Sequence, residues 1–160
     1  KTMNITIRRA DSKDYEIFNQ MFGLLNDLHA VEHPGIFQSV PGQIFSRETF
    51  AELLANPRSA VLIAEYDGQP AGFVQLMLRD THEVPVMTPR TYAVVDSLYV
   101  HSELRQLGLG EMLMMSGEEW ALENGADSLV LNVYDFNTAA RGLYEKLGYQ
   151  PISRKLIKWL

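Results

Sequence analysis

The segment from Arg105 to Gly110, RQLGLG, has the residue types of a loop that binds phosphate. Glycine lacks a Cβ atom, so its main chain can approach a phosphate oxygen closely and can adopt positive φ. The segment lies between a strand-forming run, 92–100, and helically spaced apolar residues that start at Leu109. Because the first N–H groups of a helix are unpaired and partly positive, this junction could hold an anion. A tight turn without a ligand explains two glycines equally well.

The spacing excludes the commoner nucleotide loops. No Gly-Lys-Ser/Thr follows, so the segment is not a nucleoside-triphosphate P-loop. The dinucleotide fingerprint needs a third glycine where this chain has Leu113. Neither ATP nor NAD is therefore indicated.

A second segment, 137–149, has Asn137, Ala140, Tyr144, Gly148 and Tyr149 at fixed offsets. Together with the Arg/Gln-x-x-Gly-x-Gly loop after a strand, it resembles the two hallmarks of the GNAT acetyltransferase superfamily. The resemblance spans most of the chain and implies acetyl-CoA as co-substrate. By resemblance, the cofactor-binding residues are Leu98, Tyr99, Val100, Arg105, Gln106, Leu107, Gly108, Leu109, Gly110, Glu111, Asn137, Arg141 and Tyr144.

The resemblance also implies the catalytic roles. Tyr144 would protonate the departing sulfur, since a phenol held beside it is a usable donor, although packing on an apolar helix face also explains a tyrosine there. Asp96 is the candidate base and would need burial or an intervening water to act. Strict alternation would place it on the same strand face as Val94, Leu98 and Val100. The Val100 N–H would polarise the acyl carbonyl if a bulge or splay leaves it unpaired.

The acceptor pocket of the family draws on the first two helices and on the loop before the central strand. By this resemblance, the predicted acceptor-binding residues are His29, Glu32, His33, Phe37 and His82, together with Asp96. His29 and His33 stand four apart, as two metal ligands on a helix would. No convincing third ligand accompanies them and Pro34 ends the helix, so we expect no metal.

Composition narrows the function further. The length of 160 residues suits one domain, 1–160. A net charge of −6 disfavours nucleic-acid binding and favours a cationic acceptor such as an amine. The absence of cysteine excludes thiolate catalysis. No apolar run has the length of a membrane span or the design of a signal peptide, so we expect a cytoplasmic protein, monomeric or homodimeric, without a membrane partner.

The coarse pattern predicts an α/β (α+β) fold with a GNAT-like, mostly antiparallel sheet flanked by helices. In the family, a central parallel pair splays apart around the cofactor, and here that pair would be 92–100 and 128–134. Asp11 and Ser46 are predicted helix caps, and Asp67-Gly68 is a hairpin turn. The predicted strands are 5–8, 60–66, 71–78, 92–100, 128–134 and 152–159, and the predicted helices begin after 11, 46, 108 and 137.

The predicted activity is transfer of an acetyl group from acetyl-CoA to a primary amine by direct attack in a ternary complex. A small-molecule amine is the expected acceptor. Two alternatives stay open: transfer to a protein N-terminus or lysine, and a noncatalytic CoA-binding regulatory module.

Overall fold

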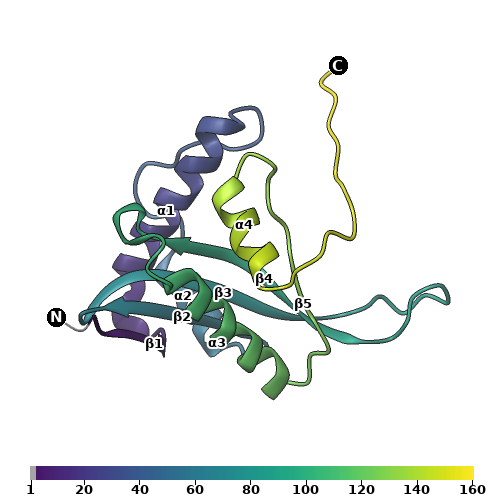
Figure 1. Ribbon diagram of the computed structural model, residues 1–160, viewed down its shortest axis with the longest axis horizontal. Coiled ribbons are helices and arrows are strands. Elements are labelled where there is room, and N and C mark those ends of the chain that lie inside the picture. Colours follow the sequence, from purple (N-terminus) through teal and green to yellow (C-terminus); the bar gives the residue numbers. More distant parts are fainter. Residues whose placement is uncertain (1–2) are drawn as a thin grey trace.

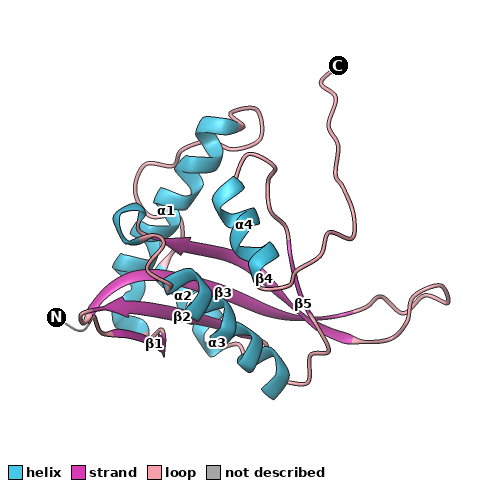
Figure 2. Ribbon diagram, in the orientation of Figure 1, coloured by secondary structure: helices cyan, strands magenta, loops and turns pink. Residues whose placement is uncertain are grey.

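The computed structural model describes residues 3–160, so residues 1 and 2 of the predicted domain lie outside the described part. The strands form one sheet in the order β1-β2-β3-β4-β5; the first four are antiparallel, and β5 runs parallel to β4 (Figure 1). The mixed, mostly antiparallel sheet confirms the predicted fold class (Figure 2). The strands are β1 Ile5–Arg9, β2 Ser59–Tyr66, β3 Gln69–Asp80, β4 Thr91–Val100 and β5 Leu129–Leu131. The helices are α1 Tyr15–Glu32, α2 Arg47–Ala55, α3 Leu109–Glu123 and α4 Thr138–Lys146, with short 3-10 helices at Ser12–Asp14 and Ser102–Leu104.

The predicted local signals set the ends of several elements. The Asp11 carboxylate accepts from the Lys13 N–H and forms a capping box with Asp14. Ser46 caps α2 by accepting from the Thr49 N–H. Asp67 and Gly68 both have positive φ, as the central residues of a type I′ hairpin turn require, which confirms the β2–β3 hairpin.

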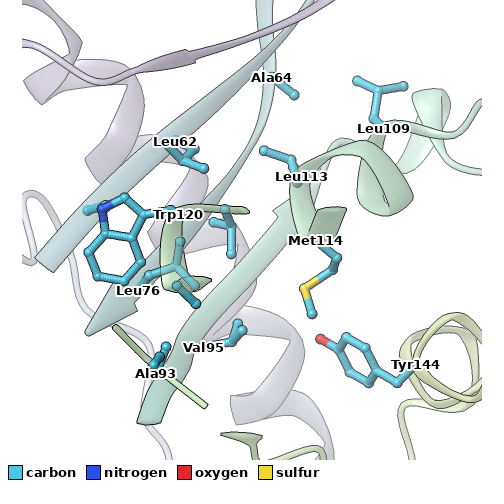
Figure 3. Packing of buried hydrophobic residues seen from close by; sticks show 14 of the residues in the cluster. Leu62, Ala64, Leu76, Ala93, Val95, Leu109, Leu113, Met114, Trp120 and Tyr144 are labelled. Carbon is cyan, nitrogen blue, oxygen red and sulfur yellow. The ribbon is translucent and has the colours of Figure 1, made fainter. Parts of the chain in front are cut away.

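The sheet separates two apolar clusters. The α1 face is an aromatic cluster in which Phe18 is fully buried and contacts Phe73 with ring centroids 5.0 Å apart. The α3 face packs Leu113, Met114 and Trp120 of α3 against small and branched residues of β2, β3 and β4 (Figure 3). Helices thus cover both faces, and β4 contributes to both clusters.

A β-bulge interrupts β4 at Asp96. Gln75 of β3 pairs with Ser97 and the next residue, Leu76, pairs with Val95, so Asp96 is the extra residue. The bulge shifts the alternation of side chains: Val95 faces α3 before it, and Leu98 faces α3 after it. The expectation that Val94 and Leu98 share a face is therefore wrong, because strict alternation does not continue through a bulge.

Two predicted strands differ from those observed. The strand at 128–134 is regular only over β5, because the chain then turns, and the Asn137 N–H donates to the Tyr134 carbonyl at 3.0 Å. The predicted strand at 152–159 is wrong: residues 149–160 form neither helix nor strand. After α4 this segment runs away from the sheet, where it has no ladder to join (Figure 1). Across residues 3–160, no helix has the length and hydropathy needed to cross a bilayer.

Candidate active site

A pocket lies where β4 continues past the end of β5. The two strands pair only between Ala93 and Val95 on β4 and between Leu129 and Leu131 on β5, so the following residues of each strand diverge. Asp96, Asn137 and Tyr144 all line this space. The other lining residues are Leu25, His29, Val95, Ser97, Leu98, Leu131, Asn132, Val133, Tyr134 and Ala140. The structure thus brings together the two predicted catalytic residues and one wall of the predicted acceptor site.

Tyr144 lies on the pocket side of α4. Its side chain is buried, its ring packs edge-on to Tyr149 at 5.9 Å, and its hydroxyl points toward Met114 and Val95 (Figure 3). Burial raises the pKa of the Tyr144 phenol to about 12, because the anionic form is poorly solvated there. The phenol therefore stays protonated at neutral pH and is available as a donor.

Asp96 owes its position to the bulge. Partial desolvation raises the pKa of its carboxyl above the ordinary value, while the positive charge of Arg79 opposes that shift. A raised pKa makes the carboxylate a better proton acceptor than an ordinary aspartate. Asp96 is nevertheless exposed to solvent, so the desolvation that a base at this position would need is only partial.

The end of β4 directs main-chain groups into the gap. The His101 N–H donates to the Ala71 carbonyl at 2.9 Å, which makes Val100 and Gly72, one position along, a non-hydrogen-bonded pair. The Val100 N–H therefore faces away from β3, toward the side where β5 has ended. No bulge lies at Val100, and the divergence of β5 supplies the opening instead. Tyr99 turns its ring to the α1 face, where it is buried.

The glycine loop has the expected form. Gln106 and Gly108 both have positive φ, and Gly108 is the N-cap of α3, at φ 92°. Arg105 folds back, with Nε 3.3 Å from the Val100 carbonyl oxygen. A Cβ at Gly110 would approach the Leu143 side chain to 3.1 Å, so the start of α3 lies directly against α4.

Three charged or polar residues of α3 and α4 already have partners within the chain, which determines the charge and the donors that an anion would meet. Glu111 is held by Lys146 of α4, with Nζ 2.9 Å from its carboxylate, so one negative charge at the helix start is balanced. Asn137 caps α4 by accepting from the Ala140 N–H at 3.1 Å and also lines the pocket. Arg141 donates to the Asp135 carbonyl at 3.1 Å, which fixes it beside the turn before α4.

The predicted acceptor side is an aromatic cluster that joins distant segments. His29 and His33 of the α1 end contact Tyr134 at ring separations of 5.3 and 5.2 Å, and Phe37 contacts Tyr134 at 5.4 Å. Phe136 completes the cluster against both histidines. Tyr134 and Phe136 were not selected from the sequence; their aromatic spacing just before Asn137 was the available signal.

The remaining predicted acceptor residues lie elsewhere. Glu32 is exposed on the last turn of α1. His82 lies in the long hairpin between β3 and β4, which projects from the right of the molecule, whereas α1 ends at the top (Figure 1). It is not among the residues that line the pocket.

His29 has the hydrogen bonding of a packed side chain. His29 Nδ1 lies 2.9 Å from the Leu25 carbonyl, which can only accept, so Nδ1 carries the proton. Within residues 3–160, no group of three or more histidine, aspartate or glutamate side chains is arranged to hold a metal ion.

Comparison with known proteins identifies the class. Residues 24–149 match the family model described as Acetyltransferase (GNAT) family. This match covers more than half of the chain, and the chain belongs to that family.

Three relatives carry acetyltransferase names. The uncharacterized N-acetyltransferase YhfO of Bacillus subtilis is 36% identical over 97 residues, which are 61% of this chain and 62% of the relative. The putative ribosomal protein bS18-alanine N-acetyltransferase of the same organism is 35% identical over 102 residues, 64% of this chain and 61% of the relative. An uncharacterized N-acetyltransferase of Archaeoglobus fulgidus is 29% identical over 143 residues, 86% and 88% of the two chains. The chain thus spans less than two thirds of the length of the two Bacillus relatives.

Solved structures share the fold. A mutant of the BH1408 protein from Bacillus halodurans superposes with a TM-score of 0.90 at 23% identity, over 97% of this chain and 99% of that one. AAC(6′)-Iy, in complex with the bisubstrate analogue CoA-S-monomethyl-acetylneamine, superposes with a TM-score of 0.73 at 18% identity, over 98% of both chains. At these identities the similarity concerns the fold.

Proposed function

We propose that this chain is an acetyl-CoA-dependent N-acetyltransferase that acts on a primary amine of a small molecule, by direct attack in a ternary complex. The observation that carries the proposal is the pocket itself. Beyond the end of β5, Asp96 and Tyr144 line one opening, next to the main-chain groups of β4.

The residues around the glycine loop suit the phosphate end of coenzyme A. The first amides of the 15-residue helix α3 follow a left-handed Gly108 in an exposed loop, so several N–H donors are available to one anion. The carboxylate in the first turn of α3, Glu111, is paired with Lys146 and therefore does not oppose an anion as a lone charge. When bound, acetyl-CoA supplies an acyl group on a thioester.

Two groups would act at the acyl end. The Val100 N–H faces the gap and would donate to the acyl oxygen, which gains negative charge during attack. Tyr144 would hold its proton beside the sulfur. Because its pKa is about 12 and that of a thiol is about 8.5, complete transfer is uphill, and the phenol would act first as a hydrogen-bond donor.

The proton of the attacking amine needs an acceptor. Asp96 is the carboxylate that lines the pocket, and its raised pKa suits this role, directly or through a water. With no cysteine in the chain, an acyl-cysteine intermediate is unavailable, which supports direct attack by the amine.

A small amine is favoured by the shape of the acceptor side. His29, Phe37 and Tyr134 contact one another and come from the end of α1, the loop after it and the turn before α4. Their cluster bounds one side of the pocket. Fold neighbours include an aminoglycoside acetyltransferase in complex with sisomicin. The name of the Bacillus relative that refers to ribosomal protein alanine favours the alternative acceptor, a protein N-terminus.

The test is a thiol-release assay with acetyl-CoA against a panel of amines and N-terminal peptides, accompanied by thermal denaturation with CoA. We expect release with at least one small amine and a melting temperature that rises with CoA concentration. A thermal shift without turnover on any acceptor would favour the noncatalytic module. Release only with peptides would shift the proposal to a protein acceptor, and no thermal shift would overturn it.

A further inference from the structure

The imidazole of His29 has one nitrogen that no other group of the chain uses. Its Nδ1 donates to the Leu25 carbonyl oxygen at 2.9 Å, so in the neutral ring Nε2 carries a lone pair and no proton. Over the described part of the chain, Nε2 makes no hydrogen bond, and no buried side-chain nitrogen or oxygen lacks a partner. Nε2 is therefore accessible, on a side chain that lines the pocket.

The direction of this imidazole is fixed from several sides. The ring contacts Phe37, Tyr134 and Phe136 with centroids 5.2, 5.3 and 5.5 Å away, and the last two rings meet it nearly edge to face. Together with the hydrogen bond of Nδ1, these contacts restrict rotation of the ring. The lone pair of Nε2 thus has a defined direction, as a group that orients a substrate must have.

Two side chains that line the pocket accept hydrogen bonds without donating them. They are the imidazole of His29, through Nε2, and the ionised carboxylate of Asp96. The other polar side chains of the lining are hydroxyls and amides, which donate as well as accept: Ser97, Asn132, Tyr134, Asn137 and Tyr144. Two such acceptors match a ligand that offers two donors.

A neutral primary amine offers two N–H donors besides its lone pair. In the proposed reaction, the nitrogen lone pair forms the bond to the acyl carbon, the carbon–sulfur bond breaks, and the sulfur leaves as a thiolate beside Tyr144. One N–H proton passes to Asp96, directly or through a water. The other N–H stays on the nitrogen as the amide N–H of the product, and it needs an acceptor other than Asp96.

We propose that Nε2 of His29 accepts this second N–H, and that His29 thereby selects primary amines over secondary amines. The inference rests on the proposed function. A secondary amine has a single N–H, which passes to Asp96, so its reaction would leave Nε2 against a carbon substituent. Selectivity follows because a polar group that loses its partner in a desolvated site costs free energy. His29 is a specificity-determining residue in this role, and the base remains Asp96.

The first test compares primary amines with their N-methyl derivatives, by thiol release with acetyl-CoA. The primary amines are butylamine, 2-phenylethylamine and the most active amine of the acceptor panel. We expect the wild-type kcat/KM to favour the primary amine of each pair by about tenfold or more. His29→Phe, which keeps a ring and removes the lone pair, should lower this preference about tenfold. His29→Gln, whose amide oxygen can accept, should retain part of it.

His33→Phe is the matched control for the preference. His33 contacts Tyr134 and Phe136 in the same aromatic cluster but does not line the pocket, so its replacement should keep the preference of the wild type. An unchanged preference in His29→Phe, or an equal loss in His33→Phe, would overturn the inference and leave the proposed function standing. Absence of thiol release from every small amine would instead remove the proposed function, and the inference with it.

The second test observes the nitrogen itself and does not depend on turnover. The chain has four histidines, so the imidazole nitrogen NMR signals of isotopically labelled protein can be assigned with single substitutions. In the complex with CoA, titration with butylamine should shift the Nε2 signal of His29 and leave its Nδ1 protonated. A proton on Nε2 in the free protein, or an Nε2 signal that does not move at any butylamine concentration, would contradict the assignment.

Discussion

The proposed cofactor side of the pocket and its proposed acceptor side are built from different groups. The cofactor side offers main-chain amides, at the start of α3 and at the end of β4, which are positioned by regular elements. The acceptor side offers side chains, and its rings come from the end of α1, the loop after it and the turn before α4.

The two sides should therefore differ in their tolerance to amino-acid substitution. Main-chain groups are insensitive to side-chain identity except where a glycine is needed, whereas a cluster of half-buried rings depends on every member. We therefore expect substitutions on the cofactor side to act through a few positions, and substitutions on the acceptor side to alter acceptor preference gradually.

The largest effect is expected at Tyr144, where the two sides meet. Tyr144→Phe should lower kcat about 10²-fold, a magnitude ordinary for loss of a general acid, with CoA affinity unchanged. Steady-state kinetics and CoA titration measure the two quantities. Tyr149→Phe is the control, because that hydroxyl donates to Glu118 instead of lining the pocket, and its kcat should stay near wild type. Equal effects of the two substitutions would remove the acid assignment.

Gly108→Val should weaken CoA binding about tenfold. A β-branched residue at φ 92° costs about 1–2 kcal/mol, so the loop would leave the conformation that presents the amides of α3. Calorimetric titration with CoA gives the change. Gly142→Ala on α4 is the control: its Cβ meets no atom within 4 Å, so it should raise stability by about 0.5–1 kcal/mol and leave binding intact. Unaltered binding by Gly108→Val would contradict the loop assignment.

Asp96→Asn should lower kcat/KM about tenfold at neutral pH and should remove the acid limb of the pH profile. In the wild type, activity should fall as pH drops through the raised pKa of Asp96 if this carboxylate is the base, because the protonated carboxyl cannot accept a proton. The same shift means that folding favours the protonated form, so the stability contributed by Asp96 is lost as pH rises through that pKa. The amide variant should therefore be relatively more stable at neutral pH.

Rates and melting temperatures measured across pH test both statements. Asp80→Asn is the control, since hydrogen bonding from Thr91 lowers the pKa of the Asp80 carboxyl and the residue lies outside the pocket. An acid limb that survives in Asp96→Asn would assign the base elsewhere.

The smallest effect is expected at the aromatic cluster. Phe37→Ala should raise KM for the acceptor about threefold, comparable with the loss of one aromatic pair, without changing CoA affinity. Ile36→Ala, at an exposed neighbour, is the control. A change in CoA affinity rather than in acceptor KM would show that the two sides are not separable.

The sequence predicted features that depend on neighbours along the chain. Ser46 and Asn137 are caps, and Gly125 and Gly148 have positive φ just after the ends of α3 and α4. Each of these signals acts within a few residues, so periodicity and capping rules are enough to find it. The roles assigned to the cofactor loop and to Tyr144 stay predictions, although their placement agrees with those roles.

Features that depend on distant contacts were missed. Nothing near Asp96 in the sequence indicates the bulge, which exists only relative to β3. The same holds for the cluster in which His29 contacts Tyr134 and Phe136, which lie about a hundred residues later in the chain. Residues 152–159 have the composition of a strand, but a strand forms only when a neighbouring strand pairs with it, and composition does not show whether one is present.

The bulge at Asp96 has a consequence for changes in chain length. Because it reverses the side-chain alternation, deletion of a single residue there would turn Tyr99 out of the aromatic cluster and direct Leu98 away from α3. Both apolar clusters would lose contacts at once. Replacement of Asp96 by another residue keeps the number of residues in β4, so the side chains after it keep their faces. We expect the length of this strand to resist insertion and deletion far more strongly than its composition resists substitution.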